Sequence, residues 1–187
     1  MDRFRKPAWP LWSPGVRISP SPPFLAEYRG EGTGRCIRKL LGANPAEPTL
    51  ALDYYHNNSG QITEVRKDAS ANPLEQYVWS PRYVHAPILR WRDGNTDGDL
   101  EDEGDSTLYY CADANFNVTA LVDTSGAVVE RYLYDPYGKA RVLNPDWSAD
   151  ENGDSDFANE LLFTGHRLDP ESGPAGVSTC GHQRKKR

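Results

Sequence analysis

Long apolar stretches are missing from this chain of 187 residues. No run of about 18 apolar residues occurs, so no membrane-spanning helix is expected. The N-terminus carries charge but lacks the apolar core of a signal peptide, so no export signal is visible. Hydrophobic residues make up only 37% of the chain, which predicts a thin core of the kind that depends on neighbouring repeats.

Cysteine and histidine are also scarce. The three cysteines, Cys36, Cys111 and Cys180, lie too far apart for a disulfide framework or a CxxC metal site. The four histidines include no HExxH motif and no zinc-type pair, and His166 is expected to lie at the surface. Nucleophile-elbow, phosphate-loop and dinucleotide motifs are missing too. The sequence therefore predicts a protein that is not an enzyme and has no cofactor except a candidate calcium ion, with a hydrolase as a distant alternative.

The formal net charge of -6 conceals a segregation of charge along the chain. Residues 1–41 hold eight basic and three acidic side chains, whereas residues 93–105 hold seven acidic and no basic ones. Residues 146–160 hold six acidic and no basic ones. Acidic clusters repel phosphate backbones and favour hard cations. The basic ends of the chain have the composition of solubilising tails, so no nucleic-acid partner is expected.

A short unit recurs along the chain: an aromatic residue, then Asp or Asn, two further residues, Gly, and alternating apolar residues. The carboxylate or amide of such a unit accepts backbone N–H groups two residues on, proline presets φ, and glycine permits a positive φ. The unit therefore predicts a turn followed by a strand. Weaker copies lie at 57–60, 113–116 and 28–32. The clearest turn residues are Tyr134, Asp135, Pro136 and Gly138 in one copy, and Asp123 and Gly126 in another.

Alternating side chains predict strands around these turns. Residues 117–122 and 128–134 are expected to form a hairpin, with Val118, Ala120 and Val122 on one face. Further short strands are expected at 76–79, 88–91, 108–111 and 161–164. The predicted fold class is all-β, built from antiparallel β-hairpin repeats.

Three regions follow from composition. Residues 1–26 contain six of the 15 prolines and are expected to form a disordered leader. Residues 27–173 are expected to form the repeat region, interrupted by acidic surface loops at 93–105 and 145–160. Residues 174–187 show no strand alternation and are expected to form a disordered tail.

The segments RYLYDPYGK at 131–139 and LFTGHRLDPESG at 162–173 resemble the YD-repeat, or RHS-repeat, family. The resemblance covers about residues 27–173. It implies a spiral of β-hairpins that forms a hollow shell around a C-terminal polypeptide, often a toxin, or that serves as a large secreted or cell-surface protein. The implied partners are neighbouring YD-repeat units or the cargo of a larger protein.

The chain departs from this family after Gly173, where a tyrosine- and arginine-rich strand and a self-cleaving core usually follow. The sequence is therefore interpreted as truncated before both. Asp135, Pro136 and Gly138 match the DPxG pattern of the family's cleavage site, but they lie inside a YD unit without the Gly-Gly-Asn context. We interpret them as a turn.

The acidic segment at 93–101 matches the first nine positions of a DxNxDGDxx calcium loop. The candidate metal ligands are Asp93, Asn95, Asp97, Asp99 and Glu101. The match fails at position twelve, which is glycine instead of a bidentate acid, and no flanking helices are evident. The two interpretations left open are weak calcium binding and a solvated acidic loop. A calcium-dependent binding or adhesion module is thus the rival function.

A second acidic cluster, at Asp150, Asn152, Asp154 and Asp156, offers a poorer set of metal ligands.

Overall fold

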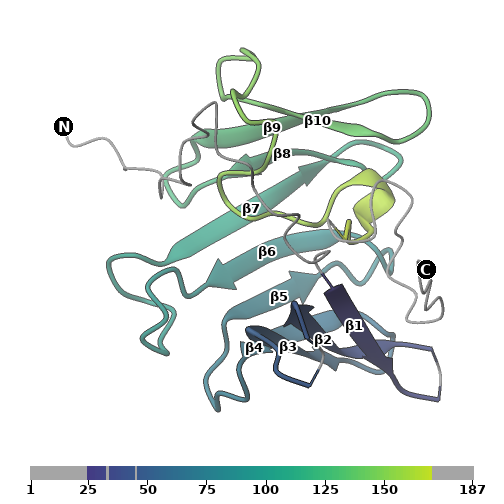
Figure 1. Cartoon of the computed structure of the whole chain (residues 1–187). Helices are drawn as coiled ribbons and strands as arrows, with labels where there is room; N and C mark the ends of the chain where they lie inside the picture. Colours follow the sequence, from purple (N-terminus) through teal and green to yellow (C-terminus); the bar gives the residue numbers. More distant parts are fainter. Residues whose placement is uncertain (1–24, 33, 45, 170–187) are drawn as a thin grey trace, which may run out of the picture.

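The computed structural model describes residues 25–32, 34–44 and 46–169. They form one antiparallel sheet of ten strands, in which each strand pairs with its neighbours in the chain (Figure 1). The expected all-β fold of antiparallel hairpins is confirmed. The strands are β1 (Leu25–Gly30), β2 (Cys36–Gly42), β3 (Leu50–His56), β4 (Ile62–Lys67), β5 (Glu75–Trp79), β6 (Pro87–Arg92), β7 (Ser106–Ala112), β8 (Val118–Val122), β9 (Val128–Tyr134) and β10 (Ala140–Leu143).

The described part of the chain contains one short 3-10 helix, η1 (Phe163–Gly165), and no α-helix. None of its helical residues form a segment long and apolar enough to cross a membrane. Residues 25 and 26 belong to β1, so the sheet begins inside the leader expected at 1–26. The rest of that leader and the tail at 174–187 lie outside the described residues.

The predicted turn chemistry is present at four hairpins. Each turn begins with an Asp or Asn, counted here as its first residue. The backbone N–H of this residue donates to the carbonyl of the fifth residue, and its side-chain oxygen accepts the backbone N–H groups of the third and fifth residues. The fourth residue of each turn has a positive φ, between 62° and 84°. These turns begin at Asn57, Asp113, Asp123 and Asp135.

Two further turns refine the sequence prediction. The weak copy expected at 28–32 is displaced, because the turn between β1 and β2 is closed by a hydrogen bond from the Gly34 amide to the Glu31 carbonyl, and Gly34 has φ +82°. An additional turn follows β10, where the amide of Asn144 donates to the carbonyl of Ser148. Its fourth residue, Trp147, has φ +71° and lies against the Arg131 guanidinium, 4.3 Å from the ring centroid.

A one-residue bulge recurs in the hairpins, and in β8 it changes which side chains lie on the same face of the sheet. Cys111 pairs with Ala120, but the next residue of β7 pairs with Val118, so Thr119 is an extra residue. The expectation that Val118, Ala120 and Val122 share a face is therefore wrong. Val118 lies in the buried cluster instead.

Residues 161–164, predicted to be a strand, form only an isolated bridge between Leu161 and Arg167, followed by η1. The backbone turns there because Thr164 and Gly165 both have positive φ values, 50° and 68°. The loop at 93–105 connects β6 to β7 as expected. The second acidic insert, expected at the surface over 145–160, remains exposed at Asp156 and Ala158, but Asn159 is buried.

One face of the sheet carries two clusters of buried side chains. The first lies on β7 to β10, and the second on β3 to β5. Leu161 completes the second cluster and its neighbour Leu162 completes the first, so residues beyond the last strand fill gaps in both. We call this side of the sheet the covered face.

Candidate functional site

Residues 155–169, which we call the strap, cross the covered face (yellow-green in Figure 1). The strap begins against β9, where the Glu130 carboxylate accepts the backbone N–H of Asp156 at 3.0 Å. It ends against β2, where Lys39 donates to the buried carboxylate of Asp169 at 2.7 Å. Tyr28 of β1 also donates to Asp169. The strap thus ties strands that lie far apart in the chain.

Arg90 of β6 holds the main chain of the strap. Its side chain is completely buried, and its two terminal nitrogens donate to the carbonyls of Phe157, at 2.6 Å, and Ala158, at 3.2 Å. On β8, the Val118 amide donates to the carbonyl of Leu162 at 3.1 Å. These contacts are to backbone atoms, so they fix the path of the strap whatever its side chains.

Asn159 is the buried side chain through which the strap meets the tyrosines of the sheet. Its Nδ2 donates to the Tyr132 hydroxyl at 3.0 Å, and its Oδ1 accepts from the Tyr110 hydroxyl at 3.2 Å. Burial raises the pKa of Tyr110 to about 12, so this phenol stays a neutral hydrogen-bond donor at physiological pH. Tyr132 also donates to Glu130, two residues before it on the same strand.

Glu75 of β5 is the buried anion beside this network, with 3% of its surface exposed. Its carboxylate accepts the Tyr77 hydroxyl at 2.6 Å and contacts the Arg92 guanidinium. Burial alone would raise the pKa of Glu75, but guanidinium charges outweigh burial and hold that pKa below its ordinary value. They belong to Arg90, 3.8 Å away, to Arg167 of the strap and to Arg92.

Arg167 anchors the far end of the strap. It pairs with Glu160 of the same segment, and its guanidinium lies 4.8 Å from the centroid of the Tyr54 ring. Burial raises the pKa of Tyr54 to about 12. The expected surface role of His166 is not what the structure shows: this half-buried ring stacks on His85, with 4.1 Å between the centroids.

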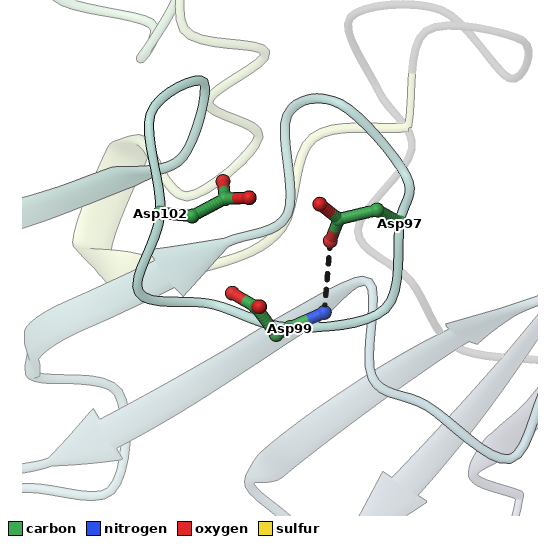
Figure 2. A group of neighbouring side chains, drawn as sticks. All are labelled: Asp97, Asp99 and Asp102. Atoms are coloured by element: carbon green, nitrogen blue, oxygen red, sulfur yellow. Dashed lines mark hydrogen bonds between the residues drawn. The ribbon is translucent and has the colours of Figure 1, made fainter.

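The structure divides the candidate calcium ligands into two groups. Asp93 is buried, and its carboxylate caps the loop by accepting the backbone N–H groups of Thr96 and, at 2.9 Å, Gly98. Asp97 and Asp99 turn outward and meet Asp102, with carboxylate oxygens from the three residues within 4.8 Å of one another (Figure 2).

The remaining predicted ligands have smaller roles. Asn95 donates from its NH2 group to Asp97, at 2.9 Å, and to Asp102, at 3.2 Å, while its Oδ1 accepts the backbone N–H of Asp97 at 3.0 Å. Glu101 contributes its backbone N–H to Asp99 at 3.0 Å. The sequence pattern missed Asp102 because position ten of the calcium loop carries no ligand.

The second acidic cluster does not converge. Asp150 accepts the backbone N–H groups of Asn152 and Gly153, and Asn152 accepts that of Asp154. Asp156 lies in the strap beside Glu130. These oxygens are used to shape the loop.

Comparison with known proteins gives matches among solved structures alone. No family model and no curated protein matches the chain. The crystal structures of TcdB2-TccC3 and of TcdB2-TccC3-Cdc42 each align at 16% identity and a TM-score of 0.48 over 79% of this chain. TcdB2-TccC3 without its hypervariable C-terminal region aligns at 17% identity and a TM-score of 0.49 over 84%. In all three the chain spans 7% of the matched chain.

Proposed function

We propose that this chain is a non-enzymatic section of a YD-repeat shell, a wall of hairpins that encloses or presents a polypeptide. The observation that carries the proposal is the repetition of one turn chemistry through a single meander of ten strands. Each hairpin buries its apolar side chains against the hairpins before and after it, which is how a repeat structure is stabilised. The partners are then neighbouring YD-repeat units or the enclosed polypeptide.

The covered face supports a structural role over a catalytic one. Its buried charges are arranged in pairs and hydrogen bonds: Glu75 with arginines and a tyrosine, Asp169 with Lys39, and Glu130 with the strap. Such a network fixes one packing arrangement. The strap occupies the side on which these groups lie, so they act on the chain itself.

Self-association is the expected behaviour of an isolated shell section. Among the described residues, β1 pairs with β2 alone. β10 pairs with β9 and, on its other side, forms only an isolated bridge from Leu143 to Ala149. Unpaired strand edges are templates for further pairing. Urea unfolding of the purified chain should therefore give a free energy below about 5 kcal/mol that rises with protein concentration. A monomer with a cooperative, concentration-independent transition above that value would contradict the proposal.

Calcium binding by the acidic loop is the second candidate function. It is favoured by the convergence of Asp97, Asp99 and Asp102. A hydrogen bond to Asp97 raises the pKa of Asp102 to about 6, whereas the pKa of Asp97 is lowered by the backbone N–H of Asp99 and by Asp102. The two carboxyls thus share a proton as the pH falls through about 6, and a cation at the same position would displace it.

Calcium affinity should be weak and should decrease with acid. We expect a dissociation constant of about 10⁻⁴–10⁻³ M at pH 7.5, because few ligands converge. Since proton and cation compete, affinity should fall by several-fold at pH 5.5. Isothermal titration would measure both. Asp97→Ala should abolish the heat and Asp154→Asn, in the cluster that does not converge, should preserve it. If millimolar calcium gives no heat, the segment at 93–105 is a solvated acidic loop and not a calcium site.

A further inference from the structure

Two histidines meet where the strap closes over the connection between β5 and β6. His85 lies in that connection and His166 in the strap, and their half-buried rings stack with centroids 4.1 Å apart and planes tilted by 34°. The strap approaches closely here: a Cβ on Gly165 would lie 1.6 Å from the His85 carbonyl oxygen. The turn at 162–166 therefore lies directly against the backbone of His85.

The Thr164 hydroxyl connects the His166 ring to the turn of the strap. The Thr164 hydroxyl donates its one hydrogen to the Phe163 carbonyl, at 2.8 Å. The same oxygen lies 2.7 Å from Nδ1 of His166, so a hydrogen bond joins the ring to the turn, with a direction set by the tautomer of the ring.

The surroundings of the pair provide no counter-ion for a positive charge. From the β5–β6 connection, the Tyr83 ring meets His85 edge-on at 5.8 Å. From the β7–β8 turn, Asp113 accepts the side-chain N–H of Asn117 at 2.7 Å. On the strap, the guanidinium of Arg167 lies against Tyr54 and Glu160. Within the described residues, no carboxylate forms an ion pair with either imidazole.

We propose that the His85–His166 stack is a proton-sensitive latch, which holds the strap on the sheet at neutral pH and releases the turn at 162–166 in acid. Two imidazolium rings in this stack would repel each other, and neither has a counter-ion to offset the repulsion. A metal site fits less well, because no third metal-ligating side chain joins the pair among the residues that the structure describes.

The direction of the pH effect follows from proton linkage. Burial lowers the pKa of His85, and the neighbouring His166 lowers it further. When the strap lifts, His85 regains an ordinary pKa of about 6.5, so the open form binds more protons. The latch is thus fully closed above that pH. Opening is favoured as the pH falls below it, by up to about tenfold per pH unit for each proton taken up.

Hydrogen exchange of the Val118 amide tests this latch, because that N–H donates to the strap carbonyl of Leu162. In the full chain, its protection factor, corrected for intrinsic exchange, should fall by about tenfold or more between pH 7.5 and pH 5.5. His85→Phe keeps a ring in the stack but takes up no proton, so it should remove most of this fall. His166→Gln removes the other imidazole of the pair and should also abolish most of this fall in protection.

His56→Gln is the matched control. His56 also has a pKa lowered by burial and by the nearby Arg35, but it lies on β3 and is not part of the ring pair formed by His85 and His166. This variant should keep the full pH effect. The proposal is overturned if the wild-type protection does not change with pH, or if the fall persists in both latch variants.

Discussion

Replacing Arg90 with leucine is expected to lower the free energy of unfolding by about 3–5 kcal/mol, the usual cost of breaking a buried charge pair. The guanidinium is fully buried and donates to the carbonyls of Phe157 and Ala158. Leucine would leave both carbonyls without these donors. It would also remove one of the positive charges that hold the pKa of Glu75 low. Urea unfolding monitored by tryptophan fluorescence would measure the change, and at the upper end of this range the variant should be unfolded without urea.

The matched control for Arg90 is Arg66→Leu. Arg66 pairs with Glu64 at 2.5 Å, but its side chain is 31% exposed and solvent screens the pair, so its loss should change the free energy of unfolding very little. Equal losses in the two variants would show that Arg90 does not hold the strap. A double change, Glu75→Gln with Arg90→Leu, should recover part of the loss, because it removes the uncompensated carboxylate as well.

The turns were predictable because their chemistry is local. Asp123 and Asp135 act through backbone groups two and four residues away, so the sequence alone carries the information. Phe116 takes the position of glycine in its turn with φ +62°, and its ring stacks on Tyr83 at 4.1 Å. This ring contact, which offsets the cost of the positive φ, comes from the β5–β6 hairpin and so cannot be read from the turn itself. The bulge at Thr119 is likewise a feature of strand pairing, and it reversed the expected face of Val118.

The strap was not predictable from periodicity. Leu161, Leu162 and Phe163 have the composition of a strand, but what decides the path of the segment is a set of contacts with residues 47 to 68 positions earlier, such as Arg90 and Asn117. A local signal did exist in the recurrence of Glu-x-Tyr on β5 and β9, where each tyrosine donates to the glutamate two residues before it. Because the two side chains share a face of the strand, this spacing indicates a buried polar pair.

Gly165→Ala should destabilise the protein more than an ordinary glycine substitution. Gly165 has φ +68°, a conformation that costs an alanine about 1–2 kcal/mol. An added Cβ would also lie 1.6 Å from the His85 carbonyl oxygen and 2.7 Å from its carbon, so backbone must move. Overpacking adds about 1–3 kcal/mol, which gives an expected total of about 2–5 kcal/mol in urea unfolding.

Gly126→Ala separates the two contributions. Gly126 has a similar φ of +84°, but nothing lies within 4 Å of its added Cβ, so this variant should lose only the conformational cost of about 1–2 kcal/mol. The excess loss in Gly165→Ala then measures how tightly the strap is seated. It should be accompanied by faster exchange of the Val118 amide, which Gly126→Ala should leave protected. The opposite result is that the two variants lose the same stability and the Val118 amide stays protected in both. The strap backbone at Gly165 would then move without extra loss of stability, and its close contact with His85 would not hold it to the sheet.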